Sequence, residues 1–361
     1  IMAPQNLAYH MPGAFRLEQT PDTDRMEEAF QQVVDTEPML RTGFEMKDGQ
    51  VCAVIHEHAA FHMETVEGQN FEAACKAFLR PFVMDTPPLM RAALWTMPEG
   101  GTMLLMDCHH IIGDGTSTPL LLERVESWLA HGKSAASEWN YYDHLANKPE
   151  SRPETVAYWK DHLAGLPEPA FIPKDVKCST GFSWEGQTTG IQLGIEQSRR
   201  LEAFCEQKGI TPFVLFAGAW GILHARVSGK SRLVVGTPVS LRRRPETQKI
   251  CGPMIDTLPL CLDPLPEKST SQYLDEIRTE VEHLLEYDDI SLEKILTELN
   301  LPRKVGENAL YQVMIAMTPF DISDLKLFGK PVDYVPVPTG TAKMDWAMEF
   351  GKTGESYQLR F

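Results

Sequence analysis

The chain has 361 residues, of which 43% are hydrophobic and 23% charged, a composition typical of a soluble globular protein with room for two cores. Its net charge of -16 argues against a nucleic-acid partner, because contacts with phosphate need clustered Lys and Arg side chains. No apolar run is long enough to span a bilayer and no signal segment opens the chain, so we expect no membrane partner.

The seven cysteines indicate a reducing compartment. They are odd in number and contain no CxxC pair, so neither a disulfide framework nor a zinc ribbon is expected. No cysteine has surroundings typical of a nucleophile, and buried filler is the favoured interpretation for each of them. The sequence therefore predicts a cytoplasmic protein.

The first half of the chain alternates helices with pairs of strands. Hydrophobic periodicity predicts a helix over 22–36 with Asp22 as its N-cap, and then a hairpin that turns at Asp48–Gly49. Two strands flank a Pro-Glu-Gly-Gly turn, and the second, Thr102 to His109, is apolar enough to be covered on both faces. Further helices are predicted over 69–80, 117–131 and 153–163.

The second half repeats this mixture after a segment rich in proline. Residues 166–181 show no hydrophobic period and are the predicted linker. Strands are expected at 183–194, 232–240, 254–262 and in the tail from 310, and helices at 196–208, 211–227 and 271–286. The pattern predicts an α+β protein with an N-terminal lobe over 1–165 and a C-terminal lobe over 182–361.

The stretch LLMDCHHIIGDGTST, residues 104–118, is the candidate reaction centre. Side chains alternate across a strand, so His109 and His110 point to opposite faces and at most one enters a given site. Gly113 and Gly115 allow a sharp turn and a close approach of the backbone to a ligand. Asp114 can reach an imidazole or a cation elsewhere, and the helix that follows offers backbone N–H groups to developing negative charge.

A neutral imidazole at this place is suited to general-base catalysis. It can take a proton from an amine, hydroxyl or thiol that attacks an acyl group, and activated substrates would make a Ser or Cys nucleophile unnecessary. Two other interpretations stay open, namely a packed strand end and a metal site built from His and Asp. The opposed histidines count against a metal, and the absence of GxxxxGK[ST] and GxGxxG predicts no bound nucleotide or flavin.

The HHIIGDG segment resembles the HHxxxDG motif of the condensation domains of nonribosomal peptide synthetases. Seven further stretches resemble that family in the same order: EPMLRTGF (37–44), YYDHLAN (141–147), VVGTPVSLRRRPE (234–246), ICGPMIDTLPL (250–260), YDDISLEKIL (287–296), ENALYQVMIAM (307–317) and TGTAKMDWAMEF (339–350). The chain departs from the family where Asp256 replaces Asn, Pro253 and Met254 replace two aromatic residues, and Gly113 replaces Ser. The family's opening segment is absent, and we expect the C-terminal lobe to be truncated at its end.

The resemblance implies two chloramphenicol-acetyltransferase-like lobes in a V-shaped pseudo-dimer with a central tunnel. It implies an amide-forming acyltransferase, in which an acceptor amine attacks a donor thioester and both are delivered on phosphopantetheine arms. The implied partners are the donor and acceptor carrier (thiolation) domains and an adjacent adenylation domain, with the chain a monomeric module within a larger synthetase of secondary metabolism. No bound cofactor and no metal are expected.

The resemblance also assigns roles to residues. His110 is the catalytic candidate, either as general base or as a hydrogen-bond partner that positions the amine. Asp114 is implied to be structural and to pair with Arg242, while His109 and Gly115 support the loop. Arg41 matches a family arginine and is expected to form a structural ion pair. Arg243 and Arg244 are candidates for contacts to a phosphate or a carrier.

Two alternatives to amide formation remain at this point. One is epimerisation or ester formation on the same scaffold. The other is a catalytically inactive domain that docks or recruits carriers. The intact HHxxxDG motif counts against an inactive domain, whereas the altered CGPMIDT segment counts slightly for it.

Overall fold

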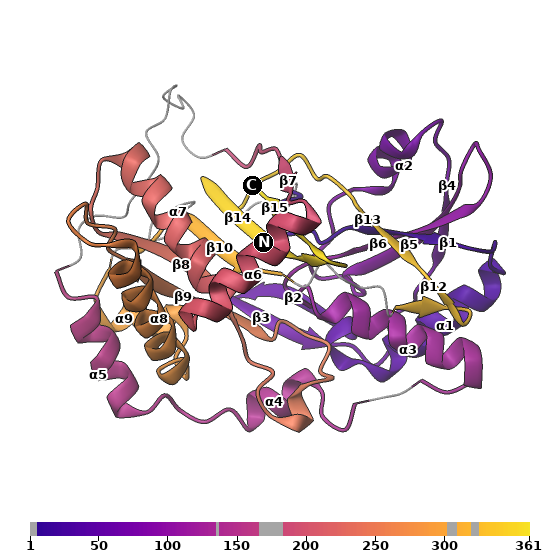
Figure 1. Cartoon of the computed structure of the whole chain (residues 1–361). Coiled ribbons are helices and arrows are strands. Elements are labelled where there is room, and N and C mark those ends of the chain that lie inside the picture. The colour runs from indigo at the N-terminus through magenta and orange to yellow at the C-terminus, as the bar shows by residue number, and fades with distance from the viewer. Residues whose placement is uncertain (1–5, 135–136, 166–182, 302–308, 319–324) are drawn as a thin grey trace. The chain divides into compact units, whose positions relative to one another are not determined.

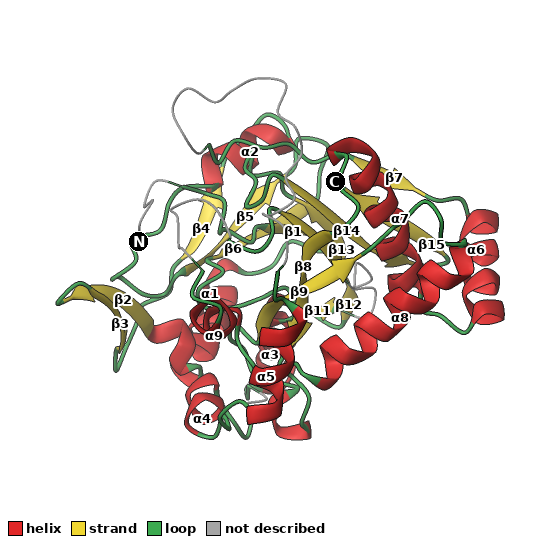
Figure 2. Cartoon of the chain, turned by 90° about the vertical axis from the view of Figure 1, so that its left-hand side faces the viewer, coloured by secondary structure: helices red, strands yellow, loops and turns green. Residues whose placement is uncertain are grey.

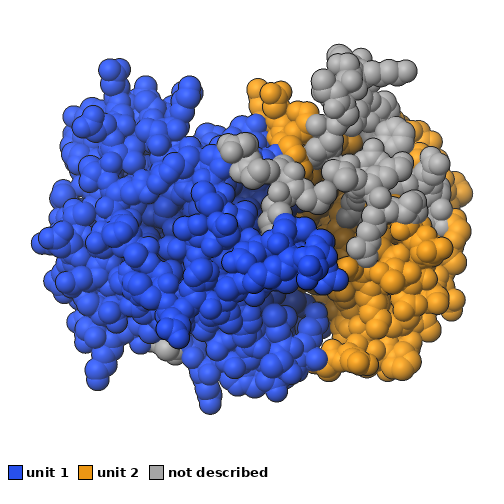
Figure 3. All heavy atoms as spheres, turned by 180° about the vertical axis from the view of Figure 1, so that it is seen from behind, with its two compact units in different colours: residues 1–148, 241–254, 322–341 blue, residues 149–240, 255–321, 342–361 orange. Residues whose placement is uncertain are grey.

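The computed structural model describes residues 6–134, 137–165, 183–301, 309–318 and 325–361 (Figure 1). The chain divides into two compact units, coloured blue and orange in Figure 3. The first unit comprises residues 1–148, 241–254 and 322–341, and the second comprises residues 149–240, 255–321 and 342–361.

These units differ from the predicted lobes in how the chain is shared between them. Residues 149–165 belong to the second unit, whereas 241–254 and 322–341 return to the first. The reason for the second return is a strand pairing, because β13 (Asp333–Pro336) is hydrogen-bonded to β1 (Gly13–Leu17). The predicted linker, 166–181, lies outside the described residues.

A five-stranded sheet forms the centre of the first unit. Its order is β13-β1-β6-β5-β4, and each neighbouring pair is antiparallel except β4 and β5. The remaining strands of this sheet are β6 (Thr102–Cys108), β5 (Met90–Thr96) and β4 (Met63–Val66). Strand β6 is central and every one of its residues is buried, as its apolar sequence predicts.

Alternation along β6 builds a core on each face of this sheet. Leu104 and Met106 pack with α1 (Thr23–Thr36) and α3 (Ser117–His131), whereas Met103 and Leu105 pack with α2 (Phe71–Phe78). Figures 1 and 2 show α2 on one side of the sheet and α1 and α3 on the other. Even-numbered and odd-numbered side chains of β6 therefore point to opposite faces of the sheet, each of which has its own core.

Local sequence signals set the ends of these elements. The carboxylate of Asp22 accepts a hydrogen bond from the Arg25 amide at 3.0 Å and caps α1, as predicted. The predicted hairpin is also present, with Asp48 and Gly49 both at positive φ in the turn. The two strands of this hairpin are β2 (Thr42–Lys47) and β3 (Gln50–Ile55). The short elements that complete the first unit are η1 (Pro38–Arg41), α4 (Tyr141–Ala146), η2 (Pro245–Thr247), β11 (Lys326–Leu327) and β12 (Lys330–Pro331).

A six-stranded mixed sheet forms the centre of the second unit. Its order is β7-β15-β14-β10-β8-β9, in which β10 is parallel to both of its neighbours. The strands are β7 (Gly190–Gln192), β15 (Ser356–Arg360), β14 (Trp346–Thr353), β10 (Val313–Met317), β8 (Leu233–Ser240) and β9 (Ile255–Leu262). The predicted strand over 183–194 is wrong in extent, because the strand β7 has only three residues, all exposed, and pairs with β15 as the edge strand of the sheet.

Helices pack against this sheet around the large side chains of Trp159, Trp220 and Tyr311, all of which are fully buried. They are α5 (Pro153–His162), α6 (Ile195–Lys208), α7 (Pro212–Ser228), α8 (Thr270–Glu286) and α9 (Leu292–Glu298). In the described part of the chain no single helix has the length and apolarity to cross a membrane. Helices α6 and α7 meet that criterion together, as a pair bent by 100°.

Candidate functional site

The two adjacent histidines lie directly after the central strand β6. The amide of His109 donates to the carbonyl of Leu89 at 2.9 Å, and the amide of His110 donates to the carbonyl of Tyr9 at 2.7 Å. His109 also forms an antiparallel bridge with His10, and the chain turns at His110. Both side chains are partly exposed, so the strand end presents them at the edge of the core.

His109 holds the turn that follows the strand. Its carbonyl accepts from the Ile112 amide at 3.0 Å, and its Nδ1 accepts from the Ile111 amide at 3.1 Å. Because Nδ1 is an acceptor, a neutral His109 ring carries its proton on Nε2. The ring also packs near Tyr9, with 6.5 Å between the ring centroids. Through these contacts His109 stabilises the loop.

The carboxylate of Asp114 is fully buried and accepts hydrogen bonds on both oxygens. Oδ1 accepts from the amides of Thr116 and Ser117 at 3.1 and 3.0 Å and from the Ser117 hydroxyl at 2.9 Å. Oδ2 accepts from the amide of Met254 at 3.0 Å. A buried carboxylate needs this number of donors, because desolvation would otherwise disfavour its charge.

Arg242 supplies the positive partner of this carboxylate. Its two terminal nitrogens donate to Asp114, Nη1 to Oδ2 at 2.6 Å and Nη2 to Oδ1 at 3.0 Å. Nη2 also donates to the carbonyl of Ile250 at 2.9 Å. Both side chains are almost completely buried, at 4% and 1% exposure. The Asp114–Arg242 pair that the family resemblance implied is therefore present.

The Ser117 hydroxyl completes this buried cluster. It lies 3.0 Å from the carbonyl of Gly252, whose own amide donates back to Ser117 Oγ at 3.2 Å. We expected the start of the helix after the motif to offer free N–H groups to a substrate. That expectation is wrong for two of them, because the amides of Thr116 and Ser117 are bound to Asp114.

The two glycines of the motif lie in different surroundings, and neither has the backbone conformation that requires a glycine. Neither Gly113 nor Gly115 has φ in the left-handed region. A Cβ on Gly113 would lie 3.1 Å from Ser117 Cβ, closer than most real contacts, whereas a Cβ on Gly115 would meet nothing within 4 Å. Gly113 is therefore tightly packed against Ser117, whereas Gly115 has open space beside it.

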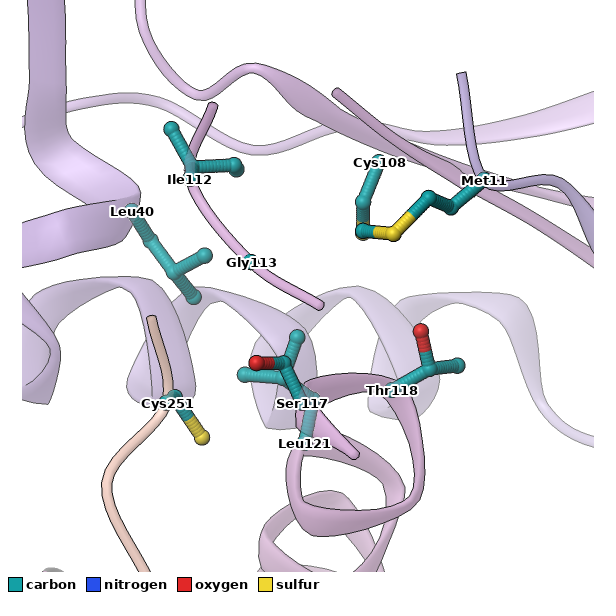
Figure 4. Close-up of a pocket in the computed structure, with 9 residues that line it drawn as sticks. All are labelled: Met11, Leu40, Cys108, Ile112, Gly113, Ser117, Thr118, Leu121 and Cys251. Atoms are coloured by element: carbon teal, nitrogen blue, oxygen red, sulfur yellow. The ribbon is translucent and has the colours of Figure 1, made fainter. Parts of the chain in front are cut away.

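A small apolar pocket lies under this loop within the first unit (Figure 4). Two of its wall residues are the buried thiols of Cys108 and Cys251. Burial raises the pKa of Cys251 to about 11, and it also raises the pKa of Cys108. Both thiols stay protonated at neutral pH, which agrees with packing rather than reactivity. The remaining wall residues are Met11, Leu40, Ile112, Gly113, Ser117, Thr118 and Leu121.

The other predicted arginines hold the backbone or lie at the surface. Arg41 donates to the carbonyls of His56 and Glu57 after strand β3 and pairs with no carboxylate among the described residues, so the expected ion pair is wrong. Arg243 and Arg244 are exposed. The guanidinium of Arg244 lies 5.1 Å from the ring centroid of Trp139.

The residues that depart from the family pattern are divided between the two units, with Pro253 and Met254 in the first and Asp256 in the second. Met254 is fully buried and gives its amide to Asp114, while Pro253 is partly exposed. Asp256 lies in the second unit, where its Oδ1 accepts from the amides of Thr257 and Leu292 at 2.8 and 3.3 Å. Asp256 thus ties strand β9 to the start of α9.

Sequence reasoning missed a second buried pair beside the motif. Nδ1 of His10 lies 2.7 Å from Oδ2 of Asp107, and both side chains are inaccessible. A signal was available, because Asp107 is the single charged residue of the buried strand TMLLMDC and must have a partner. The pairing itself needed the fold, since 97 residues separate the two positions.

The second unit contains a group with ligand chemistry for a metal. The ligand atoms of His162, Cys261 and Glu280 all fall within 4.8 Å of one another. The contacts between them also explain the group without a metal. Nε2 of His162 lies 2.7 Å from Oε1 of Glu280, which accepts the Cys261 amide at 3.0 Å. The histidines and Asp114 of the motif are not among its members.

Comparison with known proteins places this site in a family. Residues 1–334 match the family model described as "Condensation domain". The chain belongs to this family. Surfactin synthase subunit 2 of Bacillus subtilis (strain 168) is 27% identical over 99% of the chain, and Tyrocidine synthase 2 of Brevibacillus parabrevis is 28% identical over 98%. The chain covers 10% of each of these two relatives.

Solved structures of condensation domains share the fold. The first condensation domain of the calcium-dependent antibiotic synthetase, in complex with a substrate analogue, has a TM-score of 0.78 at 20% identity, covering 100% of this chain and 86% of that one. The X-domain from teicoplanin biosynthesis has a TM-score of 0.85 at 19% identity, covering 98% and 85%. A four-domain nonribosomal peptide synthetase has a TM-score of 0.83 at 19% identity, with 100% of this chain but 30% of that chain covered.

Proposed function

We propose that this condensation domain forms an amide bond between a donor acyl thioester and an acceptor amine. The amine nitrogen attacks the thioester carbonyl, the C–S bond breaks, and the proton lost by nitrogen ends on the leaving thiol. Both substrates arrive on the phosphopantetheine arms of carrier domains, so that activation comes with the donor. An adenylation domain in the same synthetase would load the carriers.

The single observation that supports this most is the buried hydrogen-bond network that supports the HHIIGDG loop. Asp114 is saturated by Arg242 and by backbone donors, so its carboxylate is committed to structure. His109 is committed to the turn through Nδ1. His110 lies at the end of β6 and is partly exposed, and the family resemblance assigns it the contact with the substrate.

His110 takes one of two roles in this reaction. As a general base it accepts the amine proton and passes it to the leaving thiolate, which is worth roughly 10²–10⁴ in rate. As a positioning partner it orients the amine lone pair by a hydrogen bond. The variants His110→Gln and His110→Ala separate these roles, because Gln keeps a hydrogen-bond partner and cannot accept a proton at neutral pH.

The test of the proposed function is turnover with defined substrates. The purified domain is supplied with a donor on one carrier and an acceptor amine on another, and amide product is measured by mass spectrometry. Ester product with a hydroxyl acceptor, or exchange of the donor Cα hydrogen, would identify the other chemistries of this scaffold. Binding of loaded carriers without any turnover would indicate a domain that docks or recruits carriers and would contradict the proposal.

A further inference from the structure

The His10–Asp107 pair lies directly beside the motif and has no part in the chemistry proposed above. Asp107 is fully buried and His10 is 5% exposed. The 2.7 Å contact between Nδ1 and Oδ2 is the hydrogen bond that Asp107 receives, because its Oδ1 has no hydrogen-bond partner in the described part of the chain. Loss of the His10 ring would therefore leave both oxygens of a buried carboxylate without a donor.

A cation and an aromatic ring hold this pair in place. Arg91 is directly opposite Asp107 on strand β5, and its guanidinium lies 3.8 Å from the ring centroid of Phe82. Burial lowers the pKa of Arg91 to about 10, with the charge of Asp107 opposing that shift, so Arg91 is a cation at neutral pH. Phe82 in turn stacks on His10, with 4.9 Å between ring centroids. The imidazole of His10 is thus fixed by packing as well as by its hydrogen bond.

The backbone around His10 is attached to the two histidines of the motif. The Met11 amide donates to the carbonyl of Cys108 at 2.9 Å, and the Tyr9 carbonyl accepts from the amide of His110 at 2.7 Å. Between these bonds, His10 and His109 form a bridge, and their rings meet edge to face at 5.8 Å. The three residues Tyr9–Met11 therefore act as a brace, bonded at one end to the strand and at the other to His110.

We propose that His10 is a positioning residue for His110. Its bond to Asp107 anchors the middle of the brace to strand β6, and the carbonyl of Tyr9 then sets the place of the His110 backbone. Near-attack geometry is sensitive to such placement, because a displacement of about 1 Å can cost on the order of 100-fold in rate. The inference rests on the proposed function of His110, and its test is chosen to separate the two.

The kinetic test uses two substitutions of His10 and one control. His10→Phe keeps an aromatic ring against Phe82 but removes the donor to Asp107, and we expect kcat to fall about tenfold or more with KM within about twofold. His10→Asn retains a donor and should stay within about threefold of the parent kcat. The control, His224→Phe, replaces a buried histidine of the second unit and should keep the parent kcat. Parent kcat in His10→Phe, or equal loss in His10→Asn and His10→Phe, would overturn the inference.

A spectroscopic test does not depend on turnover. In protein labelled at histidine, the ring and amide resonances of His110 should move in His10→Phe and stay in place in His224→Phe. If the parent has no condensation activity, the proposed function fails, and this comparison still decides whether His10 positions His110. Unmoved His110 resonances would overturn the inference.

If His10→Phe does not fold, spectra of the parent protein and of a second variant, Asp107→Asn, test the inference. The Nδ1 proton of His10 should appear as a downfield, slowly exchanging resonance, and Asp107→Asn should shift both this proton and the His110 amide. Absence of the His10 proton, or an unchanged His110 amide in Asp107→Asn, would overturn the inference.

Discussion

Arg242 and Asp114 are 128 residues apart in the sequence, and two hydrogen bonds of 2.6 and 3.0 Å join their side chains in the core of the first unit. Two nitrogens of the guanidinium donate to the two oxygens of the carboxylate, and this bidentate geometry is the strongest for such a pair. The bond closes the segment 241–254 onto the HHIIGDG loop. Asp114 therefore belongs to the support of the site.

Asp114→Ala should destabilise the domain strongly. It leaves the charge of Arg242 buried without a partner, which costs about 3–5 kcal/mol in the free energy of unfolding. Chemical denaturation measures this loss. The control is Glu298→Ala, which breaks an exposed ion pair with Lys160 and should change the free energy of unfolding by about 0–1 kcal/mol. An Asp114→Ala variant with parent stability and no activity would instead place Asp114 in the chemistry.

His110→Ala should abolish turnover and leave the fold intact. The side chain is partly exposed at a strand end, so its removal creates little cavity. The rate of amide formation should fall by roughly 10²–10⁴, while the melting temperature stays close to that of the parent. His131→Ala, at the exposed end of α3, is the matched control and should behave as the parent. Turnover by His110→Ala at the parent rate would disprove the assignment.

Gly113→Ala and Gly115→Ala should differ in their effect on the free energy of unfolding. A methyl group on Gly113 meets Ser117 at 3.1 Å, and Ser117 is fixed by its bonds to Asp114 and Gly252, so we expect a loss of about 1–3 kcal/mol. A methyl group on Gly115 meets nothing, and stability should not fall. If substrate approaches the loop there, Gly115→Ala lowers kcat/KM at parent stability. Equal melting temperatures for the two variants would contradict the packing argument.

Stability should fall in mild acid partly because of His224. This residue is 1% exposed between Trp220 and Trp346, and burial lowers its pKa from 6.5 to about 4. Between these pH values the unfolded chain binds a proton that the folded chain does not, so the free energy of unfolding decreases as the pH drops from about 6.5 to about 4. The contribution then levels off.

Melting curves of the parent and of His224→Phe over this pH range check the prediction. The parent should lose more stability than the variant between pH 6.5 and 4, because the phenyl ring cannot bind a proton. Parallel pH profiles would show that His224 does not resist protonation in the folded state.

Exhaustive chelation should leave condensation activity unchanged, since the proposed chemistry uses an imidazole and substrates that arrive activated. Activity is measured before and after chelation, and again after addition of a divalent metal. The group of His162, Cys261 and Glu280 belongs to the second unit, and the residues of the motif belong to the first. Loss of activity that a metal restores would replace the metal-free mechanism with one in which a metal takes part.

Several of the helices and strands could be predicted from the sequence, because their signals are local. Asp22 and the apolar positions after it predict α1 within one residue of its observed start, and Asp48–Gly49 predicts the hairpin turn. The apolar run before His109 predicts a strand buried on both faces, and this is confirmed by the two cores that meet on β6. The HHIIGDG motif and the stretches around it also indicated the family.

Local signals did not show which segments share a core, because that depends on the order of the strands. Arg242 lies in the predicted C-terminal lobe, yet its segment folds back onto the first unit, and β13 returns to pair with β1. The partner of Asp107 could not be read from the sequence for the same reason. A buried charge shows that a partner exists, but the choice of His10 depends on which segment the strand order brings beside β6, and no local periodicity encodes that order.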